Sequence, residues 1–417
     1  MATLDPTQGW LVTPAAAPRV IAPAYDSLSP GERARTADAN PDSFLNVTRS
    51  PEDQVPGREI DHDTLLRTAR ATLERLLREG AFRPQPRPGY RILRMRLGEH
   101  VQTGVVGTVP VGEIGSVVRL HEETRADKED DLVRHLEVVG VSSSPVGLVH
   151  RGPSPVADIV EGVTAGAPEL VATSDDGLEQ RVWTVDDPDD VAAVRGSFAS
   201  VPALYLTDGH HRAAAAVRHA RSHGSATDGP GSRLLVVAFP AGELRLEPYH
   251  RAVRGVGRDR AGEVLAAIRE RFEVEPVPEG AAPTPPSETG DFALHLDGRW
   301  FTVRTSPDAE AVDPVAALAA TVLQERILGP VLGIADARSD DRLEFVPGPR
   351  GLAELVRRAG ADGAAFALPP TRVSELMAVA DAGAVMPPKS TWFEPKVRSG
   401  MFLHPVTAGW DGHGLVG

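Results

Sequence analysis

The chain has 417 residues, of which 41% are hydrophobic and 24% charged, and its formal net charge is −14. A chain of this length is longer than a single hydrophobic core usually organises, so we expect a globular protein of two domains. The negative charge argues against nucleic acid and anionic lipid as partners. The absence of cysteine excludes disulfides and thiolate metal sites. Because there is no membrane-spanning apolar run and no signal-peptide pattern, we expect a cytoplasmic protein.

Lysine is rare in this chain. Only three of its 44 cationic residues are lysines, namely Lys128, Lys389 and Lys396. Arginine is therefore the default cation, and a retained lysine indicates a position that needs a compact ammonium group rather than a planar guanidinium. Chance is the alternative explanation for so small a number.

Residues 1–60 are rich in proline, alanine and polar residues. Residues 20–26 predict a short strand that runs into a turn at Tyr25 and Asp26, where turn chemistry is the simpler explanation for both side chains. A helix start with proline in its first turn follows. The clearest amphipathic helix covers residues 63–79 and is ended by Gly80.

A β-rich region over residues 91–120 ends in a strongly charged segment, 121–131, in which eight of eleven residues carry a formal charge. Glu129 and Asp130 fit the solvated face of a helix. His121 and Glu122 follow directly from a strand, which places them at the edge of a sheet or in a cleft.

Residues 204–216 predict a buried strand, a tight glycine turn and an alanine-rich helix. Helix starts expose unpaired N–H groups and bind anions. A simple N-cap by Asp208 with solvated neighbours is the alternative. It does not explain two imidazoles and a guanidinium beside a buried strand, so we favour a functional turn made of Asp208, Gly209, His210, His211 and Arg212.

Later segments predict strand 234–239, followed by His250 and Arg251, then helix 260–272 and a hairpin around Asp297-Gly298. The character of the sequence changes near residue 255, which suggests one domain over residues 1–253 and a second over residues 254–417. Residues 386–396 hold three prolines, two aromatic residues and two of the three lysines. This strap either packs on the surface or also delivers Lys389 or Lys396 to a site.

The phosphate loop of P-loop proteins, the dinucleotide-binding glycine motif, the zinc-protease motif and the hydrolase nucleophile elbow are all missing from the sequence. Two kinds of chemistry fit the remaining residues. One is phosphoryl transfer, which relies on positioning and charge neutralisation. The other is a mixed histidine and carboxylate metal site with His210 or His211, His121 and Asp208 as candidate ligands. A module that binds a nucleotide without turnover is a third possibility.

Nearly the whole chain resembles the bacterial domain-of-unknown-function family 1015. The residues that carry this resemblance are Ala22-Pro-Ala-Tyr-Asp26, His121-Glu-Glu-Thr124 with Lys128 and Asp131, Asp208-Gly-His-His-Arg212, His250-Arg251, and Pro388-Lys-Ser-Thr-Trp-Phe-Glu-Pro-Lys396.

The family is similar in turn to the free serine kinases of the ParB/sulfiredoxin-like fold. In those enzymes a matching turn binds the phosphates of ADP or ATP, and an upstream glutamate activates the hydroxyl of serine. Glu122 is the best match for that glutamate, and Glu123 is the alternative. The two motifs lie further apart here, and His211 stands where the kinases commonly have threonine.

The resemblance implies an α/β (α+β) protein with a ParB/sulfiredoxin-like N-terminal domain and a smaller C-terminal α/β domain. It implies an ADP- or ATP-dependent phosphotransferase that requires Mg²⁺ and acts on a small hydroxyl metabolite, with L-serine as the first guess. A nucleotide-binding regulatory or scaffold protein is the alternative, and a metal-dependent hydrolase is less favoured.

We expect catalytic roles for Glu122, Glu123, His121 and Asp208, with Asp208 or Glu122 as a possible metal ligand. Nucleotide binding is expected of Gly209, His210, His211, Arg212, Lys128, Lys389 and Lys396, and substrate binding of Tyr25, Asp26, His250 and Arg251.

Overall fold

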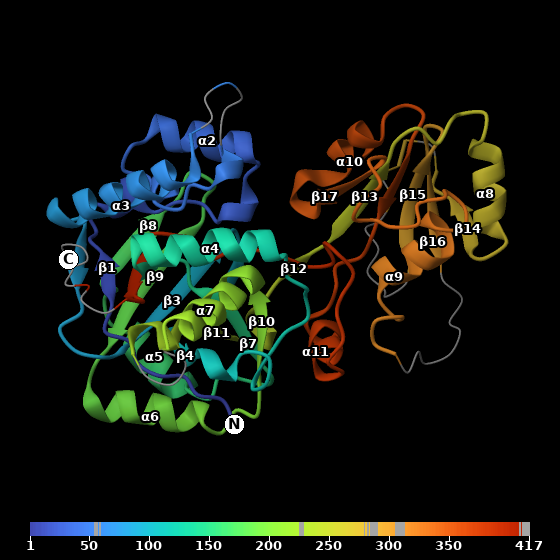
Figure 1. Cartoon of the computed structure of the whole chain (residues 1–417). Coiled ribbons are helices and arrows are strands. Elements are labelled where there is room, and N and C mark those ends of the chain that lie inside the picture. Colours follow the sequence, from blue (N-terminus) through green and yellow to red (C-terminus); the bar gives the residue numbers. More distant parts are fainter. Residues whose placement is uncertain are drawn as a thin grey trace. The chain divides into compact units, whose positions relative to one another are not determined.

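The computed structural model describes residues 1–53, 57, 60–224, 229–278, 280–281, 283, 291–304, 313–407 and 410. The chain forms two compact units (Figure 1). Unit 1 is Met1–Leu244 with Pro395–Gly417, and unit 2 is Arg245–Glu394. This division begins unit 2 at Arg245, before the expected boundary at residue 253, because β13 (Tyr249–Val253) is hydrogen-bonded inside the sheet of unit 2. It also assigns residues 395–417, expected in the second domain, to unit 1.

Unit 1 is built on a mixed eight-stranded sheet. Its strands in spatial order are β5 (Val118–Arg119), β10 (Leu204–Asp208), β7 (Val146–His150), β11 (Arg233–Pro240), β4 (His100–Pro110), β3 (Tyr90–Leu97), β9 (Glu179–Val185) and β8 (Leu170–Thr173). Only the pairs β5–β10 and β7–β11 are parallel, and the other neighbours are antiparallel.

Both faces of this sheet are covered, because alternate residues of its strands point to opposite sides. On β3, Leu93 packs into one core and Ile92 into the other. The helices of unit 1 are α1 (Ala17–Val20), α2 (Pro30–Ala39), α3 (His62–Arg78), α4 (Ala126–Val139), α5 (Ala157–Thr164), α6 (Pro188–Phe198) and α7 (His210–Ser222). Helix α3 contributes to the first core, and α6 and α7 contribute to the second.

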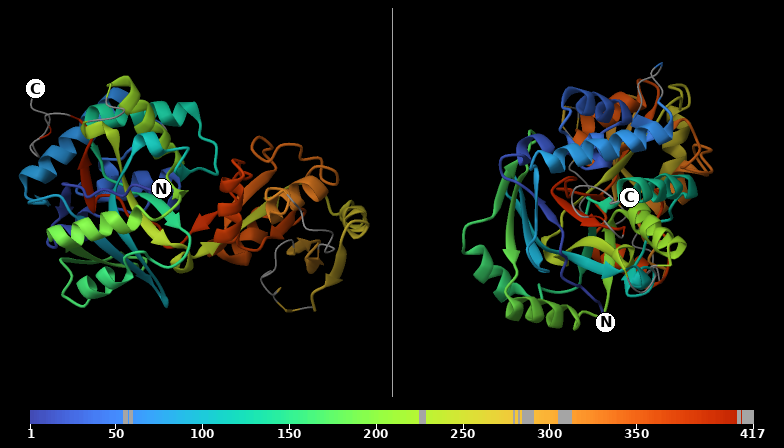
Figure 2. Two further views of the ribbon diagram at one scale, coloured as in Figure 1. Left: turned by 90° about the horizontal axis from the view of Figure 1, so that it is seen from below. Right: turned by 60° about the vertical axis from the view of Figure 1, so that its left-hand side comes forward.

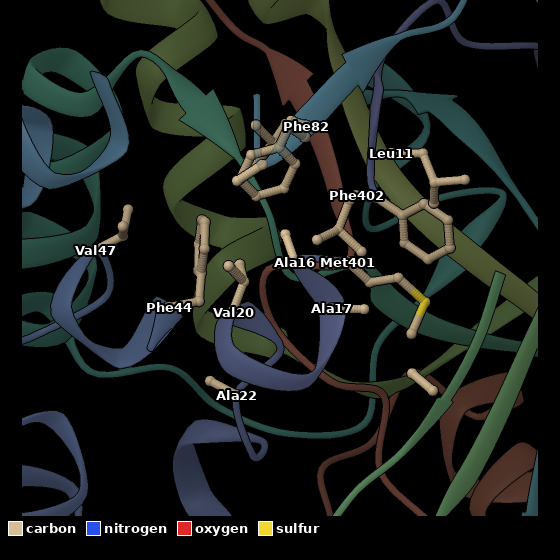
Figure 3. Packing of buried hydrophobic residues seen from close by; sticks show 14 of the residues in the cluster. Leu11, Ala16, Ala17, Val20, Ala22, Phe44, Val47, Phe82, Met401 and Phe402 are labelled. Carbon is tan, nitrogen blue, oxygen red and sulfur yellow. The ribbon is translucent and has the colours of Figure 1, made fainter. Parts of the chain in front are cut away.

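The C-terminal segment returns to unit 1 as a strand. A four-stranded sheet has the order β2 (Phe82–Pro84), β1 (Trp10–Val12), β20 (Phe402–Pro405) and β6 (Val141–Ser142). Figure 2 shows β20, coloured red, among elements from the first half of the chain. In Figure 3 Phe402 lies with Leu11, Phe44 and Phe82 in one buried cluster, which fixes the segment to the core.

Unit 2 has an antiparallel six-stranded sheet with the order β14 (Glu273–Pro276), β16 (Arg299–Arg304), β15 (Phe292–Leu296), β18 (Ala364–Ala367), β13 and β17 (Leu343–Pro347). A short pair joins β12 (Leu246–Glu247) to β19 (Trp392–Phe393). Its helices are α8 (Ala261–Arg269), α9 (Ala319–Leu323), which continues as a π-helical turn over Gln324–Leu328, α10 (Gly351–Ala359) and α11 (Val373–Asp381). Among the described residues, no helix is long and apolar enough to cross a membrane.

The mixed α/β class is confirmed, as are most of the expected elements. The hairpin around Asp297-Gly298 forms with both residues at positive φ, 47° and 74°. One expected element is wrong. Residues 20–26 form a helix end, a single bridge at Ala22 and a 3₁₀ turn rather than a strand.

Candidate functional site

The acidic segment and the 208–212 turn meet because two strands run in parallel. Strand β5 pairs with β10 in the register Leu204 to Val118 and Tyr205 to Arg119. The two carboxyl ends therefore lie at the same edge of the sheet, and the chain reaches His121-Glu122 on one side as it reaches Asp208 on the other. Two segments more than 80 residues apart in sequence become neighbours through this single pairing.

Gly209 forms the turn between β10 and α7. Its φ is 100°, a left-handed conformation that favours glycine, and it is the N-cap residue of α7. No described side chain caps this helix, so the expected alternative of an N-cap by Asp208 is wrong. A Cβ at Gly209 would stand 2.8 Å from Nη2 of Arg212. Backbone conformation and space therefore both require glycine here.

Arg212 points back across the turn. Its Nη1 donates to the main-chain carbonyls of Ser144 (2.5 Å) and Pro145 (2.9 Å), and its Nη2 donates to Oδ2 of Asp208 (2.5 Å). The planar fork of arginine suits these three acceptors. In this arrangement Arg212 fixes the start of α7 to the loop before β7.

Asp208 lies between two cations. Arg212 binds one carboxylate oxygen, and the Nζ of Lys396 lies 3.5 Å from the other. Burial alone would raise the pKa of Asp208, but the charges of Lys396 and Arg212 outweigh it and hold the pKa below its usual value. Asp208 is therefore ionised at neutral pH, and the rare lysine of the C-terminal strap is part of this turn.

His121, Glu122 and His210 form a second cluster beside the turn. The Nδ1 of His210 lies 3.6 Å from Oε2 of Glu122, and the rings of His121 and His210 meet edge to face with centroids 4.5 Å apart. Both histidines are buried, whereas the side chain of Glu122 is 48% exposed. The two imidazoles of the cluster therefore lie in the protein interior, and the carboxylate of Glu122 is open to solvent.

Burial keeps both imidazoles neutral. It lowers the pKa of His121 to about 4, against a small opposite effect of the main chain at Leu206. It also lowers the pKa of His210 well below its ordinary value, and the neighbouring His121 adds to that effect. At neutral pH each ring therefore offers an unprotonated nitrogen.

His211 points elsewhere and has a structural contact. Its Nε2 accepts a hydrogen bond from the main-chain N–H of Arg125, the N-cap residue of α4, at 3.1 Å. Arg218, further along α7, binds Glu129 and Asp130 of α4. These contacts fix α4 to α7, and the two helices lie side by side in Figure 1. Glu129 and Asp130, expected to be simply solvated, thus have a partner.

The remaining predicted residues of unit 1 lie in other contacts. Lys128 pairs with Glu52. The hydroxyl of Tyr25 contacts Oγ of Ser50 at 2.5 Å, and burial raises the pKa of Tyr25. Glu123 is exposed next to Glu122. The side chain of Asp26 lies outside the described part of the structure.

His250, Arg251 and Lys389 belong to unit 2. The Nδ1 of His250 accepts the main-chain N–H of Leu368 at 3.2 Å, and burial lowers the pKa of His250 to about 4. Arg251 is buried and donates to the main-chain carbonyls of Tyr249, His250, Pro388 and Lys389. Burial lowers the pKa of Arg251 to about 9. Within unit 2 these residues attach the 388–389 segment to β13, and their expected substrate role stays a prediction.

The sequence did not indicate two of the groups that complete the turn. The carbonyls of Ser144 and Pro145 receive Arg212, and Oγ of Ser144 contacts Oγ of Ser399 at 2.6 Å. Main-chain carbonyls carry no residue-type signal, so a motif search cannot find them. Ser399 lies three residues beyond the strap of residues 386–396 and was not among the expected site residues.

The chain belongs to a family whose function is unknown. Residues 4–321 match the family described as protein of unknown function (DUF1015). No curated protein matches the sequence. Family membership therefore leaves the activity to be argued from the site.

Three solved structures are distantly similar to the chain. Free serine kinase in complex with AMP is 14% identical over 72% of this chain and 92% of its own, with a TM-score of 0.35. C-terminally truncated SbnI from Staphylococcus aureus is 12% identical over 72% and 87%, with a TM-score of 0.38. A conserved hypothetical protein from Pyrococcus furiosus is 15% identical over 70% and 93%, with a TM-score of 0.35.

Proposed function

We propose that this chain is a nucleotide-dependent phosphotransferase that acts on a small hydroxyl compound, with ADP or ATP as the donor and free L-serine as the first substrate to test. Unit 1 would then be a nucleotide-binding domain of the ParB/sulfiredoxin-like type. The observation that carries the proposal is the position of Glu122. Its carboxylate lies 3.6 Å from His210, the first residue of α7, so an acceptor for a hydroxyl proton stands beside a helix start.

The start of α7 fits a phosphate group. The first N–H groups of a helix point outward and carry partial positive charge. Here no described side chain caps them, and Gly209 lets the backbone come close to a ligand. We assign Gly209 and the main chain of His210 to phosphate binding. Arg212 and Lys396 act as positioning residues, since their charged groups hold Asp208 and the preceding loop.

Glu122 is assigned as the general base that accepts the proton of the attacking hydroxyl. The side chain is half exposed, so a substrate can reach it from solvent. The buried imidazole of His210 borders the carboxylate on the inner side and restricts its orientation. His121 supports His210 through the edge-to-face contact of the rings.

Mg²⁺ would neutralise phosphate charge in such a reaction. Asp208 is a poor candidate ligand because Arg212 and Lys396 already bind its two oxygens. Mg²⁺ is commonly held by one or two carboxylates together with substrate phosphates. Glu123, the exposed carboxylate next to Glu122, is therefore the candidate protein ligand.

The test is a transfer assay on the full chain. The protein is incubated with ADP or ATP, Mg²⁺ and L-serine or a pool of hydroxyl metabolites, and release of AMP or ADP is measured with formation of the phosphorylated product. We expect Glu122→Gln to lower turnover by at least about 100-fold. Nucleotide affinity, measured by calorimetry, should stay nearly unchanged.

Asp127→Asn is the matched control, since it removes an exposed carboxylate of the same acidic segment that has no assigned role. Full turnover in Glu122→Gln, or an equal loss of turnover in Asp127→Asn, would contradict the assignment. A chain that binds nucleotide tightly but transfers phosphate to no hydroxyl compound would be the regulatory or scaffold protein instead.

A further inference from the structure

His121, Glu122 and His210 have the composition and spacing of a metal site. One ligand atom of each lies within 4.8 Å of the others, and Nδ1 of His210 is 3.6 Å from Oε2 of Glu122. In a tetrahedral zinc site with bonds near 2.0–2.1 Å, neighbouring ligand atoms stand roughly 3.3 Å apart. The Glu122–His210 pair already has about this separation. Side-chain rotations would bring His121 into the same range.

A second observation points to a missing partner. Within the described residues, neither ring nitrogen of His121 makes a hydrogen bond of normal geometry, and Nε2 of His210 has no partner either. His121 is only 2% exposed and His210 only 5%. Buried polar atoms in folded proteins are nearly always paired. A ligand that accepts lone pairs from imidazole would satisfy this cluster.

The donor set selects the kind of ion. Two imidazoles and one carboxylate match the open sites of Zn²⁺, which keep one position for water or substrate. Mg²⁺ prefers oxygen ligands in an octahedral arrangement, so it is a poor fit for this cluster. The half-exposed side of Glu122 gives solvent access to the fourth position. The negative charge of the Glu122 carboxylate also offsets the partial positive charge at the N-terminal end of α7, where His210 lies.

We propose that His121, Glu122 and His210 form a binding site for a transition-metal ion of the Zn²⁺ class, separate from any Mg²⁺ that accompanies a nucleotide. A second consequence rests on the proposed function. While Glu122 is bound to the metal, its lone pair is not available to accept a proton, so the same ion inhibits phosphate transfer.

The test uses the full chain after treatment with a chelator. Zn²⁺ affinity is measured by competition with a chromogenic chelator, and Co²⁺ is added as a spectroscopic probe. We expect one high-affinity equivalent and the intense visible absorption of low-coordinate Co²⁺. His210→Gln, His121→Gln and Glu122→Gln should each weaken binding by at least about 10- to 100-fold.

His223→Gln is the matched control. His219 of α7 and His223, the C-cap residue of that helix, form another histidine pair with stacked rings whose centroids are 4.4 Å apart, so the control asks whether any histidine pair suffices. It should keep the wild-type affinity. Glu122 is half exposed, so Glu122→Gln should fold even if a buried histidine variant does not, which circular dichroism would show.

Absence of stoichiometric Zn²⁺ binding, or wild-type affinity in Glu122→Gln and His210→Gln, would overturn the site. Loss of binding in His223→Gln would move it to the His219–His223 pair and equally overturn it. These measurements contain no nucleotide, so their failure is separate from that of the transferase. Transfer assayed with Mg²⁺ and a zinc chelator tests the transferase alone, and added Zn²⁺ should then inhibit wild-type turnover.

Discussion

The ammonium group of Lys396 lies 3.5 Å from Oδ1 of Asp208, although 188 residues separate them in the sequence. The opposite oxygen of Asp208 binds Arg212. The side chain of Lys396 is only 8% exposed and that of Asp208 is 31% exposed, so the pair is partly shielded from water. The end of the chain therefore completes the charge balance of a turn formed near its middle.

Lys396→Met should destabilise unit 1 by about 1–3 kcal/mol, because it leaves a partly buried carboxylate with one cation in place of two. Urea-induced unfolding measures the change. Lys128→Met is the control in the same unit. Lys128 pairs with Glu52, whose side chain is 45% exposed, so this change should cost less than about 1 kcal/mol. Equal losses in the two variants would show that burial of the Lys396–Asp208 pair has no special effect.

The sequence was sufficient for elements with a strong local pattern. The amphipathic α3, the strand and helix around Gly209, and the Asp297-Gly298 hairpin all appear as expected. The division into two units could not be predicted from local sequence patterns. It depends on β20 pairing with β1 and on β13 lying between β17 and β18, and both are contacts between distant segments.

The site was predictable in its residue types but not in its pairings. The motif around Asp208 was evident, yet only the parallel register of β5 and β10 shows that Glu122 reaches His210 rather than the far side of the sheet. His211 looked equivalent to His210 in the sequence. The two differ because successive residues of a helix point about 100° apart, which turns His211 toward α4.

Arg212→Lys should destabilise unit 1 by about 1.5–3 kcal/mol, since a single ammonium cannot reach the two carbonyls and the carboxylate that the guanidinium binds. The change in unfolding free energy is again the measurement. Arg218→Lys on the same helix is the control. Arg218 is 41% exposed, so Arg218→Lys should lower the unfolding free energy clearly less than Arg212→Lys does. An Arg212→Lys chain as stable as the wild type would mean that the positive charge alone, and not the planar guanidinium with its several donors, stabilises the turn.

Gly209→Ala should cost about 1–2 kcal/mol. The φ of 100° is unfavourable for alanine, and the new Cβ would press on the guanidinium of Arg212. Gly196→Ala is the opposite case, because this helical glycine in α6 has open space around it. That variant should gain about 0.5–1 kcal/mol from helix propensity. If both alanine variants had the same stability, the turn would not need a left-handed residue.

The stability of unit 1 should fall as the pH is lowered from 7 to 5, and His404 on β20 should account for part of the loss. Burial, with a smaller effect of the charge of Arg233, lowers the pKa of His404 to about 4. In the unfolded chain a histidine has a pKa near 6.5. Between these values the unfolded state binds a proton that the folded state does not, so stability decreases as the pH falls through this window.

The contribution of His404 is measured as a difference between two pH profiles. From pH 7 to pH 5, the shift from about 6.5 to about 4 corresponds to a loss of up to about 2 kcal/mol. His404→Asn keeps a polar group that can reach the hydroxyl of Thr7, which contacts Nδ1 of His404 at 2.9 Å. Its unfolding free energy should therefore depend less on pH than that of the wild type by up to this amount. Parallel profiles for the two proteins would show that His404 is protonated equally in the folded and unfolded chains.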